Sequence, residues 1–500
     1  MQKVSRVSRC LTVSTTMGLL LGASLCAQGP VGKPLTALPA DPAIAGALRQ
    51  VSAERIQATI EKLVTFHNRS TLSSMETDLK PGTGANAAAD WIASEFERYA
   101  AECGGCLEVK RDVYTEPGAP NTRILKPTKL TNVYAVLKGT DPAQAARRVL
   151  VTGHYDSRNS DNFNTHDAAP GANDDASGVA VSLECARVLS KLKFPSTIVF
   201  VAVAGEEQGL NGSRHLAQLA KAEGWQLEAV LNNDIVGGDT TPGDTMTDKT
   251  AVRVFSEGVP PSATPEQVRA IERLGAESDS PSRELARAMV DIDGSYFAAG
   301  SERAASAGGA RSNAIRRVPT FHPVLIFRSD RFLRGGDHTS FNLEGFTAVR
   351  LTEWRENFNH QHQNLRTENG VEYGDLLKFV DFRYVANVAR LNAAVLGDLA
   401  AAPGDPRNVH ILTQALDNNT ELTWEAPVGA PAGTAYEVLW RATDEPEWTT
   451  VESAGSELHI KLPVSKDNVV FGVRAVDGAG HRSVAVLPTP LLRAPAAAAR

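Results

Sequence analysis

The sequence predicts an α/β protein with a mostly parallel central sheet and helices on both faces, followed by a smaller all-β sandwich. Between about residues 50 and 400, short apolar runs typical of buried strands alternate with amphipathic stretches of helical period, and this alternation predicts the sheet and its helices. After residue 405 the pattern changes to short alternating runs separated by turn residues, which is typical of a β-sandwich.

The first part of the larger domain is expected to hold two helices and then two strands. Ser52–Phe66 has apolar residues on one helical face and Ser52 as a capping residue, and Gly84–Tyr99 shows a second apolar face of this kind. Leu107–Tyr114 and Thr131–Leu137 are the expected strands. The apolar runs that follow them carry the polar residues of interest.

His154 comes at the end of the first of these runs, Arg147–Thr152. Residues two apart on a strand point the same way, so Asp156 can reach the ring of His154. A carboxylate that holds a metal-ligating imidazole in this way is common in metal sites. A single histidine after a strand is more often not a ligand, so this phrase is weak evidence by itself.

Two acidic phrases follow at strand-to-helix junctions. Asp174 lies on a glycine-bracketed loop before a helix expected from Val179, and Glu206 and Glu207 follow the buried run Ser196–Val203. An acid at a helix start usually caps the helix, and a Glu pair is usually solvated. Together with His154, however, these acids come at the ends of successive elements, where open α/β sheets place their sites.

Further candidate ligands come from later in the chain. Asp234 lies inside an apolar run, where an unpaired carboxylate would be costly, so we expect a cation beside it. Two histidine phrases flank the strand expected at Thr347–Leu351: His338 precedes it, and His360 and His362 follow it. The position after the strand favours His360 or His362 over His338 as a metal ligand.

Taken in order, these motifs resemble the di-zinc exopeptidases of clan MH. That family comprises secreted bacterial aminopeptidases, with relatives among glutamate carboxypeptidases, glutaminyl cyclases and the transferrin receptor. The resemblance covers roughly residues 50–400 and implies two Zn²⁺ ions per chain. It implies that Asp174 bridges the ions, that His154 and Asp234 are the other ligands of one ion, and that Glu207 and His362 are the other ligands of the second.

The resemblance also implies roles for residues that do not bind metal. Glu206 would be the general base, Asp156 would orient His154, and the peptide bond after Asp174 would be cis. The late histidine phrase departs from the family pattern, which has a His-Thr loop. His362 is favoured as the metal ligand. His338 and His360 remain alternatives for this ligand, and they are also candidate substrate contacts.

The rest of the larger domain is less regular. Glu266–Leu274 and Ser282–Val290 are expected helices, Ala299–Arg311 is an expected flexible stretch, and Phe321–Phe327 is a further strand. A long amphipathic helix at Asp375–Leu396 is expected to close the domain. The later run of strands, with Trp424 and Tyr436 among them, resembles a fibronectin type III module.

The ends of the chain and its cysteines indicate export. Residues 1–27 have a basic start and a modest apolar centre, which predicts a cleaved signal peptide and a secreted, periplasmic or extracellular protein. The stretch is too short for a membrane span, and Cys26 leaves lipidation as the alternative. In an oxidising compartment Cys103 and Cys106 are expected to form a local disulfide, and Cys185 is expected to be a buried thiol.

The resulting plan has five parts: a signal peptide at 1–27, a linker or short propeptide at 28–50, a zinc peptidase domain at 51–400, the fibronectin-like sandwich at 405–493 and a disordered tail at 494–500. The net charge of −7 and the lack of a basic cluster argue against nucleic acid as a partner. The sandwich is a candidate for binding a surface or matrix partner.

The predicted function is a zinc-dependent aminopeptidase acting on the N-termini of peptides or proteins. Three alternatives remain: a carboxypeptidase or dipeptidase on the same fold, a glutaminyl cyclase with one zinc, and a non-catalytic receptor or adhesion protein. The motifs determine the metal ligands but not the substrate pocket.

Overall fold

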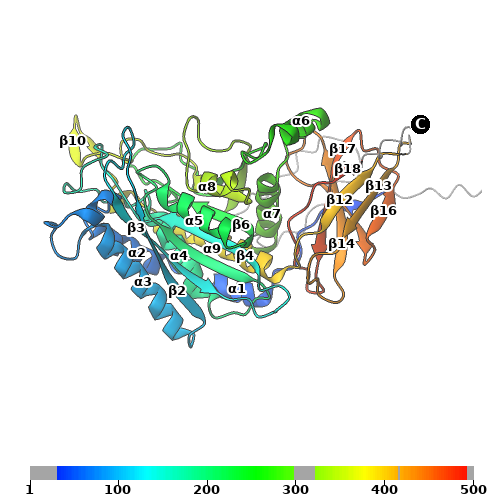
Figure 1. Cartoon of the computed structure of the whole chain (residues 1–500), viewed down its shortest axis with the longest axis horizontal. Coiled ribbons are helices and arrows are strands. Elements are labelled where there is room, and N and C mark those ends of the chain that lie inside the picture. Colours follow the sequence, from blue (N-terminus) through cyan, green and yellow to red (C-terminus); the bar gives the residue numbers. More distant parts are fainter. Residues whose placement is uncertain (1–30, 298–320, 415–416, 492–500) are drawn as a thin grey trace, which may run out of the picture.

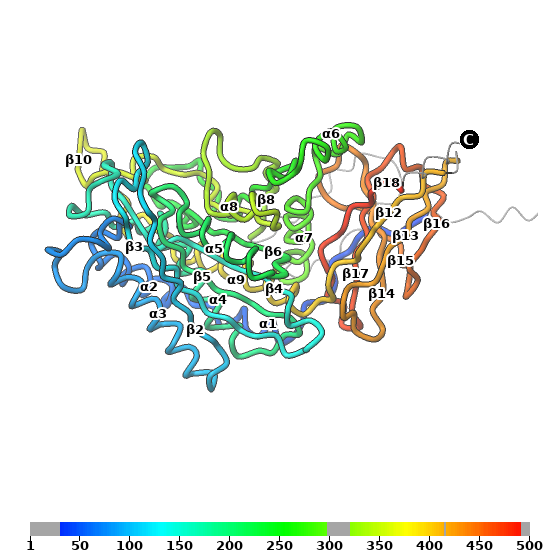
Figure 2. The backbone as a smooth tube through the Cα atoms, viewed as in Figure 1, coloured from blue at the N-terminus to red at the C-terminus, as the bar shows by residue number. Residues whose placement is uncertain are grey.

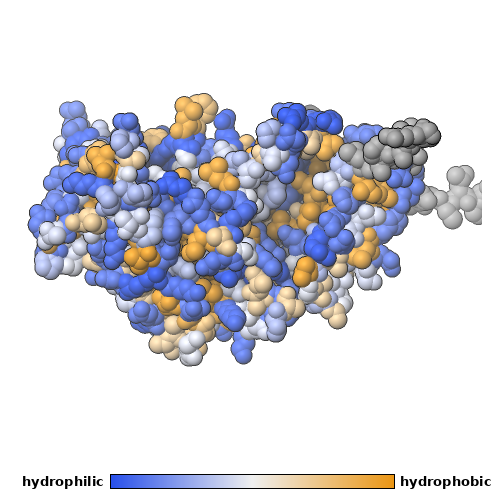
Figure 3. Space-filling view, viewed as in Figure 1, coloured by the Kyte–Doolittle hydropathy of each residue, from blue (hydrophilic) through white to orange (hydrophobic). Residues whose placement is uncertain are grey.

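The computed structural model describes residues 31–297, 321–414 and 417–491. The expected signal peptide at 1–27, the expected flexible stretch at 299–311 and the tail at 494–500 lie outside these residues. Among the helices of the described part, none is both long and apolar enough to cross a membrane. The face drawn in Figure 3 is largely hydrophilic, with apolar side chains scattered over it.

An eight-stranded sheet forms the centre of the larger domain, in the order β2-β3-β5-β4-β6-β9-β7-β8. Its middle strands β5, β4, β6 and β9 are parallel, whereas β2, β3 and the β7–β9 pairing add antiparallel edges. The expected parallel sheet is therefore confirmed at its centre. The strands are β2 (Leu107–Glu116), β3 (Thr128–Leu137), β4 (Arg147–His154), β5 (Thr197–Val203), β6 (Gln226–Asn233), β7 (Ala251–Phe255), β8 (His322–Ile326) and β9 (Ala348–Glu353).

Helices cover both faces of the sheet, as Figure 1 shows. Successive residues of β4 point to opposite faces: Val149 and Val151 join the larger core, and Leu150 joins the smaller one. This explains why the middle of β4 is apolar at three successive positions. The helices on the larger core include α2 (Ala53–Val64), α3 (Gly84–Glu102), α4 (Ala176–Leu189), α7 (Pro281–Tyr296) and α9 (Phe382–Ala401), and those on the smaller core are α5 (Asn211–Ala222) and α8 (His338–Leu343).

Several boundaries in the larger domain differ from the sequence prediction, and two of them concern the site. The closing helix α9 begins at Phe382 rather than Asp375, because the Asp381 side chain accepts hydrogen bonds from the first free amides and caps the helix there. The segment before it holds a short 3-10 helix, η2 (Leu377–Phe379). Asp234 lies one residue beyond β6 rather than inside the strand.

The segment expected as a linker or propeptide contains a two-residue strand and a short helix. β1 (Lys33–Pro34) pairs with β15 (Thr450–Gly455) of the sandwich. α1 (Pro42–Leu48) is capped by Asp41 and buries Ile44 and Leu48 against the core of the larger domain. The small Pro- and Ala-rich sequence contains apolar residues at helical spacing, which explains the helix, while its role as a linker or short propeptide stays a prediction.

The C-terminal part is a sandwich of two four-stranded sheets, β1-β15-β14-β17 and β16-β13-β12-β18. Trp424, Tyr436 and Phe471 lie in the apolar core between them. Figure 2 shows the sandwich at one end of the long axis, beside α7 and α6 (Pro265–Leu274). The remaining strands are β12 (Arg407–Leu412), β13 (Thr420–Glu425), β14 (Ala435–Ala442), β16 (His459–Leu462), β17 (Val469–Val476) and β18 (Thr489–Leu491).

Buried polar contacts join the sandwich to α7. Asp279, just before the helix, contacts both Arg441 of the sandwich and Arg287 of α7, the latter at 2.9 Å. The Trp448 indole donates a hydrogen bond to Glu284 over 3.0 Å. The two parts of the chain therefore share an interface that removes charged groups from water.

Candidate metal centre

The candidate ligands gather at the carboxyl ends of the central parallel strands. His154 is the last residue of β4, Glu206 and Glu207 follow β5, and Asp234 follows β6. His362 lies on the loop after β9, with its backbone in the left-handed region at a φ of 58°. Residues separated by more than two hundred positions thus meet at one edge of the sheet.

The side chains form two adjoining groups that could each hold a metal ion. His154, Glu206 and Asp234 form one group, and Asp174, Glu207 and His362 form the other, with the ligand atoms of each group within 4.8 Å of one another. These groups contain all the residues proposed as metal ligands and the proposed base.

Asp174 joins the two groups. Its Oδ1 lies 3.1 Å from His154 Nε2, and its Oδ2 lies 2.9 Å from His362 Nε2. His362 Nε2 is also 3.0 Å from Glu207 Oε1, while His154 Nε2 is 3.8 Å from Asp234 Oδ1. A carboxylate with one oxygen toward each histidine has the placement that a ligand shared by two ions requires.

The loop of Asp174 is held by two further acids. The Asp375 carboxylate accepts hydrogen bonds from the backbone amides of Asn173, at 2.9 Å, and Asp174, at 2.7 Å. Asp175 caps α4 through the amide of Gly178 and also accepts from the amide of His154 at 3.0 Å. The peptide bond between Asp174 and Asp175 is cis.

Asp156 lies on the outer side of His154, where the sequence placed it. Its Oδ1 is 3.4 Å from His154 Nδ1, and its backbone carbonyl is 3.2 Å from the same nitrogen. The carboxylate also accepts hydrogen bonds from Thr71 and from the amides of Glu206 and Glu207. Asp156 therefore ties the histidine on β4 to the acidic turn after β5.

Two arginines that the sequence reasoning missed contact the outer atoms of the ligands. Arg158 Nε donates to Glu207 Oε2 over 2.8 Å, and its Nη2 donates to His362 Nδ1 over 2.6 Å. Arg350, a fully buried residue of β9, lies 2.9 Å from Asp234 Oδ2. Its charge inside an apolar strand was a sequence signal of a buried anion nearby.

The electrostatics of the centre reflect its concentration of acids. Burial opposes the charged form of His154, but Asp156, Asp174 and Asp234 raise the pKa of its imidazole well above the ordinary value. Burial raises the pKa of Glu206 well above its usual range. Charge of one sign at this density favours the binding of cations.

The donor set fits zinc. Imidazole nitrogens and carboxylate oxygens are the usual ligands of zinc sites that catalyse reactions. His154 Nε2 and Glu207 Oε1 are buried atoms without a hydrogen-bond partner, and one faces into each group. A metal ion would satisfy both atoms.

Two predicted substrate contacts are placed elsewhere. His338 is fully buried and hydrogen-bonds the Ser329 carbonyl through Nε2, 2.7 Å away. His360 is 3.1 Å from Asp239 and stacks on Phe379. Both histidines pack inside the protein, and their contact with substrate stays a prediction.

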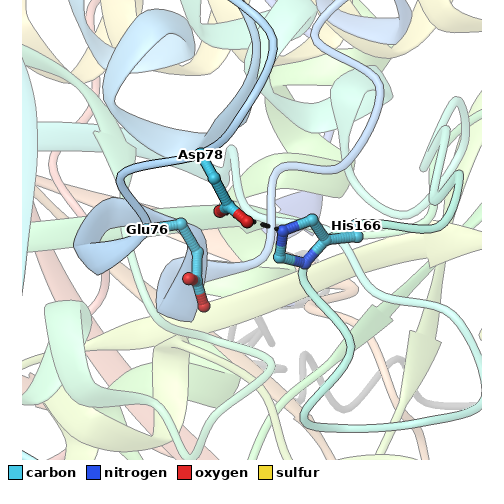
Figure 4. A group of neighbouring side chains, drawn as sticks. All are labelled: Glu76, Asp78 and His166. Carbon is cyan, nitrogen blue, oxygen red and sulfur yellow. Dashed lines mark hydrogen bonds and ion pairs between the residues drawn. The ribbon is translucent and has the colours of Figure 1, made fainter.

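A third group of potential ligands, shown in Figure 4, lies on the surface. Glu76, Asp78 and His166 are exposed, and His166 Nε2 contacts Asp78 over 3.1 Å. The cysteine pair lies apart from these sites: Cys103 and Cys106 form a disulfide, and Cys185 is a buried free thiol.

An α/β sheet that gathers two histidines and several carboxylates at its strand ends defines a metalloenzyme. Comparison with known sequences agrees: the profile of peptidase family M28 matches residues 132–259. A probable zinc metalloprotease of Pyrenophora teres f. teres is 45% identical over 463 residues, covering 92% of this chain and 89% of the relative. The chain belongs to peptidase family M28.

Two further similarities extend the comparison. A probable zinc metalloprotease of Pyricularia oryzae is 43% identical over 469 residues, covering 93% of this chain and 88% of the relative. The crystal structure of Legionella pneumophila LapA superposes with a TM-score of 0.50 at 20% identity, covering 73% of this chain and 78% of LapA. The latter similarity concerns the fold alone.

Proposed function

We propose that this chain is a zinc-dependent aminopeptidase that hydrolyses the first peptide bond of a peptide or protein with a free N-terminus. The observation that carries the proposal is the pair of ligand groups joined by Asp174, with the Glu206 carboxylate beside them. The names of the relatives, probable zinc metalloproteases, support zinc as the metal.

The residues divide into those that would hold two zinc ions and those that act on the substrate. His154 and Asp234 would hold one ion, Glu207 and His362 the other, and Asp174 both. The metal, when bound, supplies a Lewis acid for the scissile carbonyl and lowers the pKa of the attacking water. Asp156, Asp375, Arg158 and Arg350 keep the ligand atoms oriented.

Glu206 would act as the general base. Its neighbour Glu207 contacts His362 and Arg158, whereas Glu206 is partly exposed beside His154 and Asp234. The carboxylate would take a proton from the attacking water and deliver it to the amine of the leaving peptide. A raised pKa, caused by burial, suits a group that must both accept and release a proton.

The charges around the centre favour an amine over a carboxylate as the bound end of the substrate. The two arginines that contact the ligands, Arg158 and Arg350, are already paired with Glu207 and Asp234. Asp337 is fully buried, and neither of its carboxylate oxygens has a hydrogen-bond partner. Asp337 is also close enough to Glu206 to raise the pKa of that acid. The excess acid supports an aminopeptidase rather than a carboxypeptidase.

Paired substrates and metal analysis test this proposal. Purified protein should contain two zinc ions and should cleave a C-terminally amidated peptide but not the same peptide with an acetylated N-terminus. The reverse preference would establish the carboxypeptidase alternative, and a single zinc per chain would favour the glutaminyl cyclase alternative. Glu206→Gln should keep both ions and lower kcat by about 10²–10⁴-fold; turnover like that of the wild type would exclude Glu206 as the base.

We also propose that the protein is exported through a cleaved signal at residues 1–27. The disulfide between Cys103 and Cys106 supports an oxidising compartment, since such bonds are rare in the cytosol. Sequencing the N-terminus of protein recovered from the culture medium tests the proposal. A mature chain that still begins at Met1 would contradict it.

A further inference from the structure

Gln361 lies between two histidines on the loop after β9, and its side chain contacts the acid that joins the two ligand groups. The side-chain Nε2 of Gln361 donates a hydrogen bond to Asp174 Oδ2 over 3.1 Å. Only 7% of the residue is exposed, so this amide lies inside the protein rather than in solvent.

The other end of the same amide is also occupied. Gln361 Oε1 accepts a hydrogen bond from Arg334 Nη1 over 3.1 Å. An ionised carboxylate only accepts hydrogen bonds and a guanidinium only donates them, so the amide fits between Asp174 and Arg334 in one orientation. Turning the amide over would break both hydrogen bonds and would place donor against donor and acceptor against acceptor. The contact therefore requires a side chain with a donor at one end and an acceptor at the other.

The backbone of the loop brings two consecutive side chains to the same oxygen. Successive side chains of an extended chain point to opposite sides, yet His362 Nε2 lies 2.9 Å from Asp174 Oδ2, the atom that Gln361 also contacts. His362 has a φ of 58°, in the left-handed region, which interrupts an extended path at this point. The backbone N–H of Gln361 donates to the Asn357 carbonyl over 3.2 Å, so a turn holds the residue in place.

Arg334, the outer partner of Gln361, is held at the protein surface. Its Nη1 lies 3.3 Å from Glu356 Oε2, and its guanidinium carbon lies 5.8 Å from the centre of the Phe358 ring. Glu356 also pairs with Arg331 at 2.7 Å. The Arg334 side chain is 30% exposed and Phe358 is 63% exposed. Gln361 thus connects a fixed surface arginine to the buried bridging acid.

We propose that Gln361 is a positioning residue, which fixes the rotation of the Asp174 carboxylate by tying it to Arg334. The inference rests on the proposed function, because it takes Asp174 as the ligand shared by two metal ions. Asp174 Oδ2 has more than one lone pair, so it can accept from Gln361 and still bind an ion. Asp375 holds the backbone amide of Asp174, and Gln361 holds its side chain.

The expected effect of losing Gln361 is on metal affinity rather than on folding. Removing the partner of a metal ligand typically lowers metal affinity or activity by about 10–100-fold. Gln361→Met keeps a side chain of similar length without either hydrogen-bonding end, so the Asp174 carboxylate would be free to turn. Its zinc affinity should fall by about tenfold or more, while the thermal midpoint of the metal-free protein should change little.

Two measurements on the full chain test this role. Competition with a chromophoric chelator gives the zinc affinity, and the visible absorption spectrum of the Co²⁺-loaded protein reports the geometry of the ligands around the ion. Gln361→Met should change both. A side chain that only stabilised the fold would lower the thermal midpoint and leave the Co²⁺ spectrum as in the wild type.

Gln363→Met is the matched control. Gln363 lies two residues later on the same loop and also pairs with an arginine, since its Oε1 accepts from Arg366 over 3.0 Å. Its Nε2 donates to the Phe358 carbonyl over 3.2 Å, and neither partner is a proposed metal ligand. Zinc affinity and the Co²⁺ spectrum of Gln363→Met should therefore stay as in the wild type.

Arg334→Met tests the outer end of the connection. It removes the donor to Gln361 Oε1 while the hydrogen bond from Gln361 to Asp174 remains, so zinc affinity should fall by less than in Gln361→Met. If Arg334 acts only through Gln361, the double variant should bind zinc no more weakly than Gln361→Met alone. Independent residues would instead give losses in binding free energy that add.

The outcomes separate the inference from the proposed function. Zinc affinity and a Co²⁺ spectrum like those of the wild type in a folded Gln361→Met would overturn the inference. An equal loss in Gln363→Met, or additive losses in the double variant, would overturn it too. If Gln361→Met does not fold, Arg334→Met decides, and unchanged zinc affinity there has the same meaning. A wild-type chain that binds no zinc at any concentration would overturn the proposed function itself.

Discussion

Asp375 offers the sharpest test of how the bridging acid is positioned. Its carboxylate accepts the amide of Asn173 through both oxygens, at 2.9 and 3.0 Å, and the amide of Asp174 through Oδ2, at 2.7 Å. In Asp375→Asn one oxygen becomes an NH2 group, which would face the amide donor of Asn173. The remaining hydrogen bonds would be accepted by a neutral amide oxygen instead of a charged carboxylate.

The size of the effect follows from these bonds. A hydrogen bond to a charged group contributes about 1.5–3 kcal/mol, and a neutral one about 0.5–1.5. Replacing the charged acceptor by a neutral one in two hydrogen bonds therefore weakens the hold on the loop by roughly 2–3 kcal/mol. If the loop must be ordered to bind metal, zinc affinity falls by about 30- to 150-fold, since each 1.4 kcal/mol is tenfold.

The assay is zinc affinity by chelator competition, together with kcat/KM on a chromogenic aminoacyl substrate. Asp381→Asn is the matched control, because Asp381 also accepts backbone amides, but at the start of α9 and away from the ligands. The control should lower the thermal midpoint without changing zinc affinity. Zinc binding by Asp375→Asn as tight as that of the wild type would refute the role of Asp375 in holding the loop.

Three further predictions concern stability. Burial raises the pKa of Asp293 to about 8, above the roughly 3.9 of an unfolded Asp, so the wild type loses stability as pH rises from about 4 to about 8. The thermal midpoint of Asp293→Asn, compared with that of the wild type, should therefore be higher at pH 8 than at pH 4. A difference between the two midpoints that does not change with pH would contradict this. Asp279→Asn leaves Arg441 and Arg287 without their shared buried acid and should cost about 3–5 kcal/mol of unfolding free energy, whereas Arg407→Gln, in an exposed pair, should change little. In Gly178→Ala the new Cβ would lie 2.2 Å from the Asn233 carbonyl and 2.4 Å from Asp175 Oδ2, so soluble yield and zinc content should fall, while the helical control Gly46→Ala, whose nearest atom is 3.7 Å away, should behave like the wild type.

The central strands were predictable because few folded environments suit their sequences. β5 is apolar at nearly every position and β4 has the apolar centre Val149–Val151, and burial on both faces of a sheet makes such runs favourable. Once the strands were placed, the polar residues after them were predicted to meet at one edge. The positions of His154, Glu206 and Glu207 follow from this reasoning.

The supporting residues were harder to predict because their partners are distant in sequence. Arg158 lies on a polar loop, where an arginine is ordinarily solvated, yet it contacts His362 more than two hundred residues later. Arg350 lies in an apolar strand, and the argument applied to Asp234 would have predicted a buried partner for it too. The structure pairs these two residues with each other.

The role of Asp375 was hidden by a continuous apolar pattern. Leu376, Leu377, Phe379 and Val380 extend the helical spacing of α9 toward the N-terminus, so the predicted helix began too early and included the acid. The stop signal was Asp381, whose side chain caps the helix. Only when Asp375 is outside the helix can its carboxylate turn toward Asp174.

The sandwich is built into the fold rather than appended to it. β1, from the start of the described chain, completes one of its sheets, and Asp279 and Glu284, from the larger domain, pair with its buried Arg441 and Trp448. A chain cut after α9 would lose the partner of β1 and leave the two acids without these partners, so it should fold less stably. Any partner expected for the sandwich must therefore bind a face other than the one against α7, and deleting the module would not separate binding from hydrolysis.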